Sequence, residues 1–209
     1  MDKVTVGNLG ALSLIVGPVL ALVAFALQPG ALFIDSADIS DGAAQIAASA
    51  GNADLANWMT FLVVVGLVLT LHGLQAFQSD NDDNLAQFAF TMIAVGLLGW
   101  IFAQALTLMM ADGHNVYAVK SGLVLMSAIP LSLGIAIHSY ALSNRDDFTR
   151  IIAWIVAAAS LVALVTYTIG ILDNSQLDDM IMIARICYIA WAVWFVLLGL
   201  EGLKAASSE

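Results

Sequence analysis

Two basic residues lie inside long apolar stretches of the chain, where ionisable side chains are rare. Lys120 is the only charged residue of "NVYAVKSGLVLM" (115–126), and Arg185 is the only charged residue of "MIMIARICYIAW" (180–191). Charged side chains in such segments are candidates for function by default. A guanidinium binds carboxylates and phosphates through a planar fork, and an ammonium acts as a point charge. The pair therefore predicts a site for an anion or a carboxylate group.

Asp112 and Gln104 complete this candidate ligand-binding set. Gln104 lies near the middle of the apolar stretch 86–110 and is the deepest amide in the chain, so we expect it to make a hydrogen bond between helices. Trp100, four residues earlier, is expected on the same helix face. Asp112 follows in a short polar break at the predicted outer side.

The shallow position of the two cations leaves a second interpretation open. Each lies about four or five residues from the nearer end of its stretch, a depth of about 6–8 Å. Long basic side chains can extend over that distance to the surface. The charged ends of Lys120 and Arg185 would then pair with aspartates of the neighbouring loops, namely Asp54, Asp112, Asp173 or Asp178.

His72 and His138 form a second candidate site. Each lies about five residues from the end of its apolar stretch, 56–77 and 116–140, so the two are predicted at similar depth. Two imidazoles from different helices at one level can provide both axial ligands of a b-type haem. The alternative is that each histidine donates a hydrogen bond to a backbone carbonyl or a lipid headgroup.

Soft metal ligands gather at the end of the third apolar stretch. The group consists of Met109, Met110, Asp112 and His114, with Met59, Met180 and Met182 expected at the same level. Thioether and imidazole ligands suit copper, so a metal site is a further candidate. Methionine is also an ordinary filler of apolar gaps, which is the alternative.

Residues for enzymatic catalysis do not form a recognisable set. The sequence contains no nucleophile–base set, no zinc-protease motif, and no phosphate-binding or dinucleotide-binding fingerprint, which predicts that the protein is not an enzyme. With 6 basic and 16 acidic residues, the net charge is −10. Such a chain lacks the basic surface that nucleic acids need. The single cysteine, Cys187, is expected to be a small buried apolar side chain.

The elements that carry these residues are predicted from composition and hydropathy. Of 209 residues, 61% are hydrophobic and 11% are charged, whereas a soluble domain has about 25% charged residues. About 20 apolar residues cross a bilayer as a helix, and six stretches reach that length. They cover approximately 9–28, 56–77, 86–110, 116–140, 150–171 and 180–203. The prediction is an all-α polytopic membrane protein, with one transmembrane domain over 1–209 built as a six-helix bundle.

Basic residues predict the orientation of this bundle. If six spans alternate, Lys3, Arg145, Arg150 and Lys204 fall on one side, and the loops of the other side contain no Lys or Arg. Basic residues in short loops stay in the cytoplasm. Both termini are therefore predicted to be cytoplasmic, and the protein to lie in the cell (inner) membrane. The outer side then carries Asp35, Asp38, Asp41, Asp54, Asp112, Asp173, Asp178 and Asp179.

The longest connection, 29–55, is predicted to contain a short outer helix between spans one and two. Pro29-Gly30 ends the first span. Ser40 or Asp41 can cap the short helix, and Gly51 can end it.

Small residues are expected where helices touch, because packing in lipid relies on close approach. Ser13-x-x-x-Gly17 and Ala128-x-x-x-Ser132 have the required spacing.

Trp191 and Trp194 lie in the middle of the last span. With a spacing of three they do not both fit the face that carries Arg185. One of them is therefore expected to face lipid or a partner protein.

The order of these segments resembles a known group of proteins. A first span, then "DGAAQIAASAGNADLANW" (41–58), then five closely spaced spans is similar to uncharacterised six-span bacterial integral membrane proteins. That resemblance implies a membrane bundle and brings no catalytic residues.

Three functions fit the sequence. The first is a non-enzymatic accessory or partner-binding subunit of a larger membrane complex, in contact with lipid and with other membrane subunits or copies of itself. The second is a small transporter or anion-binding membrane protein that uses Lys120 and Arg185. The third is an electron-transfer protein that holds haem b through His72 and His138.

Overall fold

The computed structural model describes residues 6–78, 84–143 and 150–207. Within these ranges the chain forms seven α-helices and one short 3-10 turn. They are α1 (Val6–Ala26), α2 (Gly42–Gly51), α3 (Ala53–Gln78), α4 (Asn84–Ala111), α5 (Tyr117–Leu142), α6 (Arg150–Leu172), η1 (Asn174–Gln176) and α7 (Leu177–Ser207). The predicted all-α fold is confirmed.

Six of these helices are long and apolar enough to cross a membrane, namely α1, α3, α4, α5, α6 and α7. They coincide with the six predicted spans, although most helices extend a few residues beyond the apolar stretch. A helix satisfies its own backbone hydrogen bonds, which is why long apolar segments adopt it in lipid. The six helices indicate an integral membrane protein.

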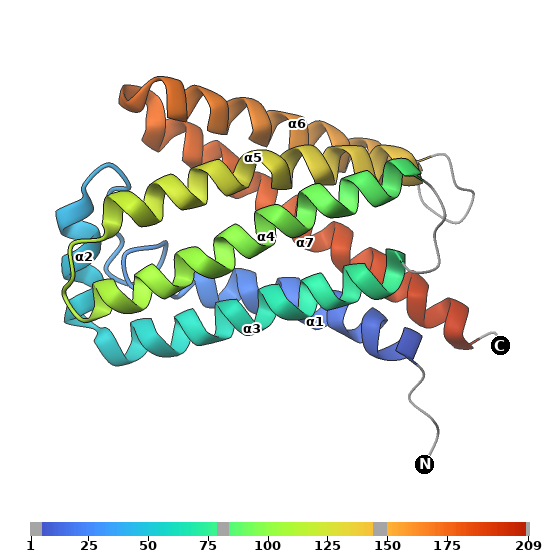
Figure 1. Cartoon of the computed structure of the whole chain (residues 1–209), viewed down its shortest axis with the longest axis horizontal. Coiled ribbons are helices and arrows are strands. Elements are labelled where there is room, and N and C mark those ends of the chain that lie inside the picture. Colours follow the sequence, from blue (N-terminus) through green and yellow to red (C-terminus); the bar gives the residue numbers. More distant parts are fainter. Residues whose placement is uncertain (1–5, 79–83, 144–149, 208–209) are drawn as a thin grey trace, which may run out of the picture.

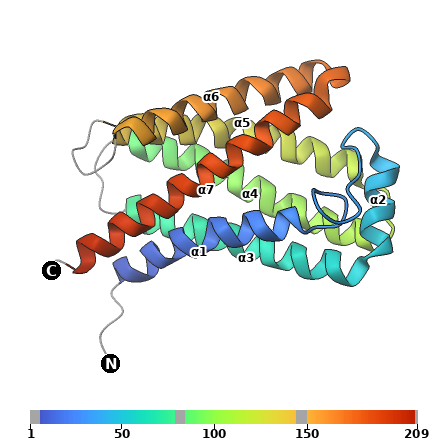
Figure 2. The same cartoon turned by 180° about the vertical axis from the view of Figure 1, so that it is seen from behind.

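The first and last described residues lie at the same end of the bundle (Figure 1). Helix α1 packs along α3, and α4 packs along α5. Helix α7 crosses the bundle obliquely: it starts beside α6 and ends beside α1 (Figure 2). As a result, α7 faces the interior along much of its length.

Helix α2 lies across the opposite end, which we call the α2 end (Figure 1). Asp41 caps this helix, because its carboxylate accepts a hydrogen bond from the backbone N–H of Ala44 at 3.0 Å. The predicted short helix in the long connection is thereby confirmed, together with one of its two predicted caps.

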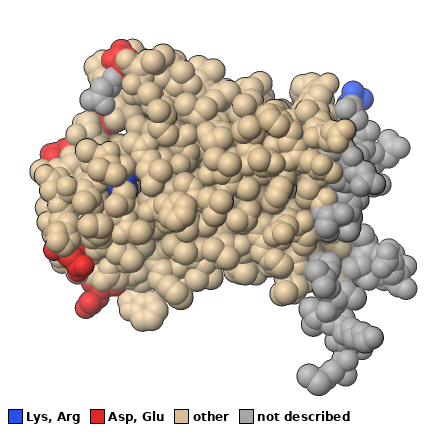
Figure 3. Space-filling model, in the orientation of Figure 1, with Lys and Arg blue, Asp and Glu red and all other residues tan. Residues whose placement is uncertain are grey.

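The described charged residues outside the cavity lie at the two ends of the bundle. The eight aspartates predicted for the outer side all lie in segments at the α2 end, and Figure 3 shows acidic surface gathered there. Arg150 and Lys204 belong to the opposite end, while Lys3 and Arg145 lie outside the described residues.

Helices α1 and α3 approach closely through glycines. A Cβ atom on Gly17 would lie 2.6 Å from the backbone nitrogen of Thr70, and one on Gly66 would lie 2.5 Å from that of Ala21. Ser13 is buried in the same helix. The expected contact role of the first small-residue pattern is therefore confirmed. In α5, Ala128 and Ser132 are likewise fully buried.

Both mid-span tryptophans of α7 are buried, in contrast to the expectation that one faces lipid. Trp191 is 4% exposed and Trp194 is 1% exposed. Trp191 donates a hydrogen bond to Ser160 of α6, and Trp194 packs against His138 of α5. The oblique course of α7 explains the difference, since a helix that crosses the interior is buried on more than one face.

Candidate ligand-binding cavity

A cavity of about 200 Å³ lies inside the bundle and reaches the α2 end. Its walls come from all six long helices and from the segment between α1 and α2. For comparison, a dry cavity of about 150 Å³ binds benzene in a well-studied protein interior. The cavity is therefore large enough for a small organic molecule.

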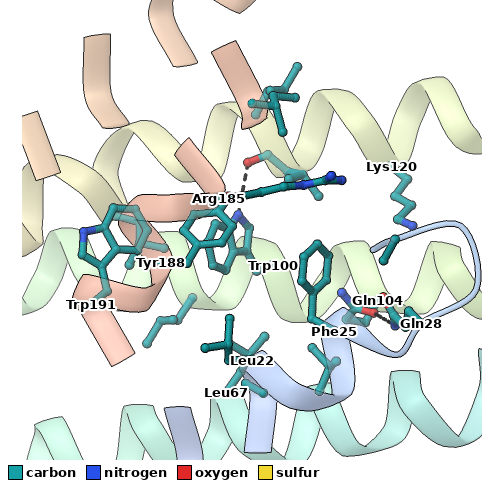
Figure 4. A pocket seen from close by; sticks show the side chains of 18 of the residues that line it. Leu22, Phe25, Gln28, Leu67, Trp100, Gln104, Lys120, Arg185, Tyr188 and Trp191 are labelled. Carbon is teal, nitrogen blue, oxygen red and sulfur yellow. Dashed lines mark hydrogen bonds between the residues drawn. The ribbon is translucent and has the colours of Figure 1, made fainter. Parts of the chain in front are cut away.

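Lys120 and Arg185 line this cavity together. In Figure 4, Lys120 comes from α5 and Arg185 from α7, and both point into the space above Phe25. Helix α7 begins at Leu177, eight residues before Arg185, so the guanidinium stem starts about 12 Å along the helix. The helix therefore extends outward beyond the apolar stretch by about one turn, and Arg185 keeps its predicted position relative to that stretch.

Neither cation pairs with the aspartates proposed as its surface partners. Asp54, Asp112, Asp173 and Asp178 are all described, and no ion pair joins any of them to Lys120 or Arg185. The Nε atom of Arg185 is buried without a hydrogen-bond partner among the described residues.

The acid that acts most directly on Arg185 is Asp178, about two turns earlier on α7. It interacts with Arg185 electrostatically rather than as an ion pair. One oxygen of Asp178 accepts a hydrogen bond from the backbone N–H of Ser40 at 3.1 Å. Among the described residues that line the cavity there is no aspartate or glutamate. The cavity wall is therefore cationic in a chain of net charge −10.

A hydrogen-bonded pair of amides forms the floor beneath the cations. The side-chain nitrogen of Gln28 donates to the carbonyl oxygen of Gln104 at 2.8 Å and to the hydroxyl of Thr60 at 3.0 Å. Because the Gln104 oxygen is engaged in this way, its amide nitrogen is turned toward the cavity (Figure 4). Gln104 thus bonds the segment after α1 rather than a second helix as predicted, and its nitrogen offers a donor to a ligand.

The segment between α1 and α2 covers the α2 end of the cavity. The chain leaves α1 through Pro29 and turns at Gly30, whose φ of 85° suits glycine. The amide of Gln45 donates to the backbone carbonyls of Gly30 and Ala37, at 3.0 and 2.8 Å. The hydroxyl of Tyr117 donates to the carbonyl of Ile39. These bonds fix the cover against both α2 and α5.

Asp38 and Ser40 attach this cover to α7. The Asp38 carboxylate accepts hydrogen bonds from the backbone N–H and the hydroxyl of Ser40, at 2.9 and 3.0 Å. The backbone N–H of Ser40, which Asp178 also approaches, is the largest cause that lowers the pKa of Asp38.

Aromatic side chains form the wall below Arg185. The ring centroids of Trp100 and Tyr188 are 5.1 Å apart, as are those of Tyr188 and Trp191. Trp100 donates to the backbone carbonyl of Val124 at 3.2 Å, and Trp191 donates to Ser160 at 2.9 Å. The indole nitrogens are thus engaged by the protein, and the rings offer apolar surface to the cavity.

The end of the cavity farthest from the α2 end is apolar. Its lining comes from Leu67, Leu97, Leu131, Ile135 and Phe195. Two hydroxyl-bearing residues also line this part. Thr70 donates to Gly66 of its own helix at 2.8 Å, and the Tyr167 hydroxyl is buried without a hydrogen-bond partner among the described residues.

The structure brings together three of the four residues of the predicted ligand-binding set. Lys120, Arg185 and Gln104 line one cavity. Asp112 is exposed at the end of α4 and does not line it. If Asp112 lined the cavity, its carboxylate would reduce the positive charge there. Its separation from the two cations therefore favours an anionic ligand.

The two histidines proposed for haem do not line this cavity. His138 is 2% exposed, and its ring packs against Phe77 and Trp194, with centroids 6.1 and 6.4 Å apart. The ring of His138 is therefore in contact with two aromatic side chains. The haem alternative stays a prediction without supporting geometry.

The soft-ligand group is likewise not gathered around one point. Met110 is 0% exposed and Met109 is 41% exposed, so the two side chains face different surroundings. Asp112 and His114 are exposed. In the described part of the chain, no group of three or more His, Cys, Asp or Glu residues is arranged to hold a metal ion.

Sequence reasoning did not identify several residues that shape the cavity. Gln28, Gln45 and Tyr117 lie at helix ends or on α2, where polar residues are ordinary. A signal was present for Gln28, because it is an amide that directly follows an apolar span and precedes Pro29. Tyr188 lies three residues after Arg185, which places both on one helix face.

No protein-family description, curated protein or solved structure matches this chain. The resemblance to six-span bacterial membrane proteins therefore stays a prediction, and function has to be inferred from the cavity.

Proposed function

We propose that this integral membrane protein binds a small anionic molecule in its internal cavity. The observation that carries the proposal is the presence of Lys120 and Arg185 in one cavity whose described lining contains no carboxylate. This is the second of the three functions that fit the sequence, and it is the one that the geometry supports best.

The physical reason is the cost of holding two half-buried cations without a counter-charge. A cation removed from water without a counter-charge is strongly disfavoured, whereas an anion beside it offsets that cost. Donors for an anion include the ammonium of Lys120, the guanidinium of Arg185 and the amide nitrogen of Gln104. Gln28 supports this arrangement by holding the Gln104 oxygen away from the anion.

The binding test uses hexanoate and inorganic phosphate as probes and thermal unfolding in a neutral detergent as the readout. A ligand that binds only the folded state raises the melting temperature. We expect at least one probe to stabilise the wild-type protein and a Lys204→Met control, whose cation pairs with Glu201 outside the cavity. The same probe should leave the Lys120→Met/Arg185→Met double variant unchanged.

Equal stabilisation of the double variant, or no stabilisation of the wild type, would overturn the proposal. A second measurement tests the proposal without depending on which ligand is chosen. Without any added anion, Lys120→Met should unfold at a higher temperature than the wild type, because methionine removes an uncompensated charge and retains the apolar stem.

Anion binding is common to a transporter and to a protein that only holds its ligand. Uptake of the stabilising probe into vesicles that contain the protein distinguishes the two. The position of the cavity near the α2 end, which the charge pattern predicts to be the outer end, supports delivery of the ligand from outside. Reporter fusions at the C-terminus test the proposed cytoplasmic position of both termini.

The accessory-subunit function is a separate proposal that rests on the absence of recognisable catalytic motifs in the sequence. Native co-purification followed by mass spectrometry tests it, since a protein that migrates alone has no larger complex to serve.

A further inference from the structure

We infer that the ligand of this cavity is a single-chain anionic amphiphile, whose charged group lies between Lys120 and Arg185 and whose aliphatic chain extends toward Ile135 and Phe195. The inference rests on the proposed function, because it assumes that an anion is held by the two cations. It adds the chemistry of the rest of the molecule.

The first support is the division of the lining into a polar and an apolar part. The two cationic side chains, Lys120 and Arg185, and the Gln104 amide are toward the α2 end. Farther along α5, beyond Ser121, the lining consists of Val124, Leu125, Leu131 and Ile135. A ligand that fills both parts must be charged at one end and apolar over the remainder.

Helix α7 shows the same order. After Arg185 its lining residues are Tyr188, Trp191, Ala192 and Phe195, so the wall becomes aromatic and then purely apolar with depth. In Figure 4, Leu22 and Leu67 lie on the opposite side of the same space. An aliphatic chain between these walls would be removed from water along its length, which stabilises the complex in proportion to chain length.

The second support is the shape of the cavity. Lys120 and Ile135 both line it and are 15 residues apart on one helix, which corresponds to about 22 Å. A volume of about 200 Å³ spread over that length is narrow. By comparison with benzene in about 150 Å³, it holds roughly eight non-hydrogen atoms. One chain of medium length fits this space, and the two chains of a phospholipid do not.

The experiment measures binding of butanoate, hexanoate, octanoate and decanoate to the detergent-purified protein, each below its micelle concentration. The wild type is compared with Ala192→Leu, which adds bulk to the apolar part, and with Ala118→Leu, a matched control at an exposed position of α5. For the wild type and the control, we expect affinity to rise about fourfold for each added methylene from butanoate to hexanoate, the factor for burial of one CH₂ group. The rise should level off once the chain exceeds the roughly eight non-hydrogen atoms that the cavity holds. For Ala192→Leu, the rise should stop at a shorter chain, while butanoate binds as it does to the wild type.

Leu97→Phe serves as a second filling variant if Ala192→Leu does not fold, since Leu97 lines the same part. Two further probes identify the source of the ligand. Decyl phosphate shares the chain and replaces the carboxylate, and it should bind as well as decanoate if the headgroup is read only as an anion. Dioctanoyl phosphatidylglycerol carries two chains and should not compete with octanoate.

The outcomes separate this inference from the function on which it rests. If butanoate binds in a manner that needs Lys120 and Arg185 but affinity does not rise with chain length, the anion site stands and the amphiphile is refuted. If the two-chain lipid competes better than octanoate, the single chain is refuted. If no carboxylate and no phosphate binds, both fail.

Discussion

Gln28 and Gln104 are 76 residues apart in sequence and share a buried hydrogen bond of 2.8 Å. The bond joins the segment after α1 to α4, and the same Gln28 nitrogen reaches Thr60 of α3. Three elements of the cavity are therefore coupled through one side chain. In an apolar surrounding, the loss of either partner leaves the other amide without compensation.

The first prediction concerns this pair. Gln28→Leu and Gln104→Leu should each lower the stability by about 1–3 kcal/mol, because one amide is left unsatisfied. The double variant should lose less than the sum, with a coupling energy of about 1 kcal/mol. Thermal or denaturant unfolding of all four proteins provides the double-mutant cycle. Additive losses would show that the bond contributes nothing.

Close approach of α1 and α3 gives the second prediction. Gly66→Ala places a methyl group 2.5 Å from the backbone nitrogen of Ala21 and should cost about 1–3 kcal/mol despite the better helix propensity of alanine. Gly122→Ala is the control, since its Cβ meets nothing within 4 Å in helix α5. That control should be neutral or stabilising by up to about 1 kcal/mol. Unfolding in one detergent compares the two, and equal effects would contradict the packing.

The third prediction concerns the hydrogen bond from Trp191 to Ser160. Ser160→Ala leaves the buried indole N–H without its acceptor and should cost about 1–3 kcal/mol. Ser132→Ala is a matched control, because its hydroxyl bonds only a carbonyl of its own helix among the described residues. Ser160→Thr retains a hydroxyl and should recover part of the loss. A loss of equal size in the Ser132 variant would refute a special role for Trp191.

Asp173 leads to a prediction about pH. It accepts hydrogen bonds from the Ser175 hydroxyl, the Gln176 amide and the Ser175 backbone N–H, and these bonds lower the pKa of its carboxyl group. A lowered pKa in the folded state means that this carboxylate stabilises the protein above the unfolded-state pKa of about 4 and ceases to do so as pH falls through the folded-state value.

Melting temperatures measured from pH 6 down to about pH 3 test this sign, since the window lies around the aspartate pKa. We expect Asp173→Asn to lose less stability over that range than the wild type. Ser175→Ala, which removes one of the three bonds, should fall between them. An unchanged acid-side slope in the asparagine variant would contradict the assignment.

The fifth prediction concerns haem. Because Phe77 and Trp194 pack against the ring of His138, we expect the purified protein to show no Soret band, even after incubation with haemin. A Soret band that disappears in both His72→Phe and His138→Phe would establish the third function and overturn this expectation.

The six helices were predictable because a continuous apolar stretch is a one-dimensional signal. Their lengths and the cap at Asp41 depend on residues that are close in sequence. Lys120 and Arg185 were found for the same reason, since a charge in an apolar run stands out wherever the helix packs.

Other features depend on how the helices pack, and a hydropathy pattern holds no information about packing. The burial of both Trp191 and Trp194 follows from the oblique course of α7 between α6 and α1. The role of Gln28 follows from its distance to Gln104 in space.

At the α2 end an acidic surface surrounds a cationic cavity, and this arrangement affects how fast a ligand arrives. An anion that approaches from water meets an acidic surface before it meets the two cations within, and like charges slow its encounter. Added salt would screen that repulsion over roughly 10 Å at 0.1 M, so association from solution should speed up as ionic strength rises. An amphiphile that travels within the lipid layer avoids the barrier altogether. The acidic surface at the α2 end would thus favour ligands that enter from the lipid layer. It would slow the entry of small anions dissolved in water.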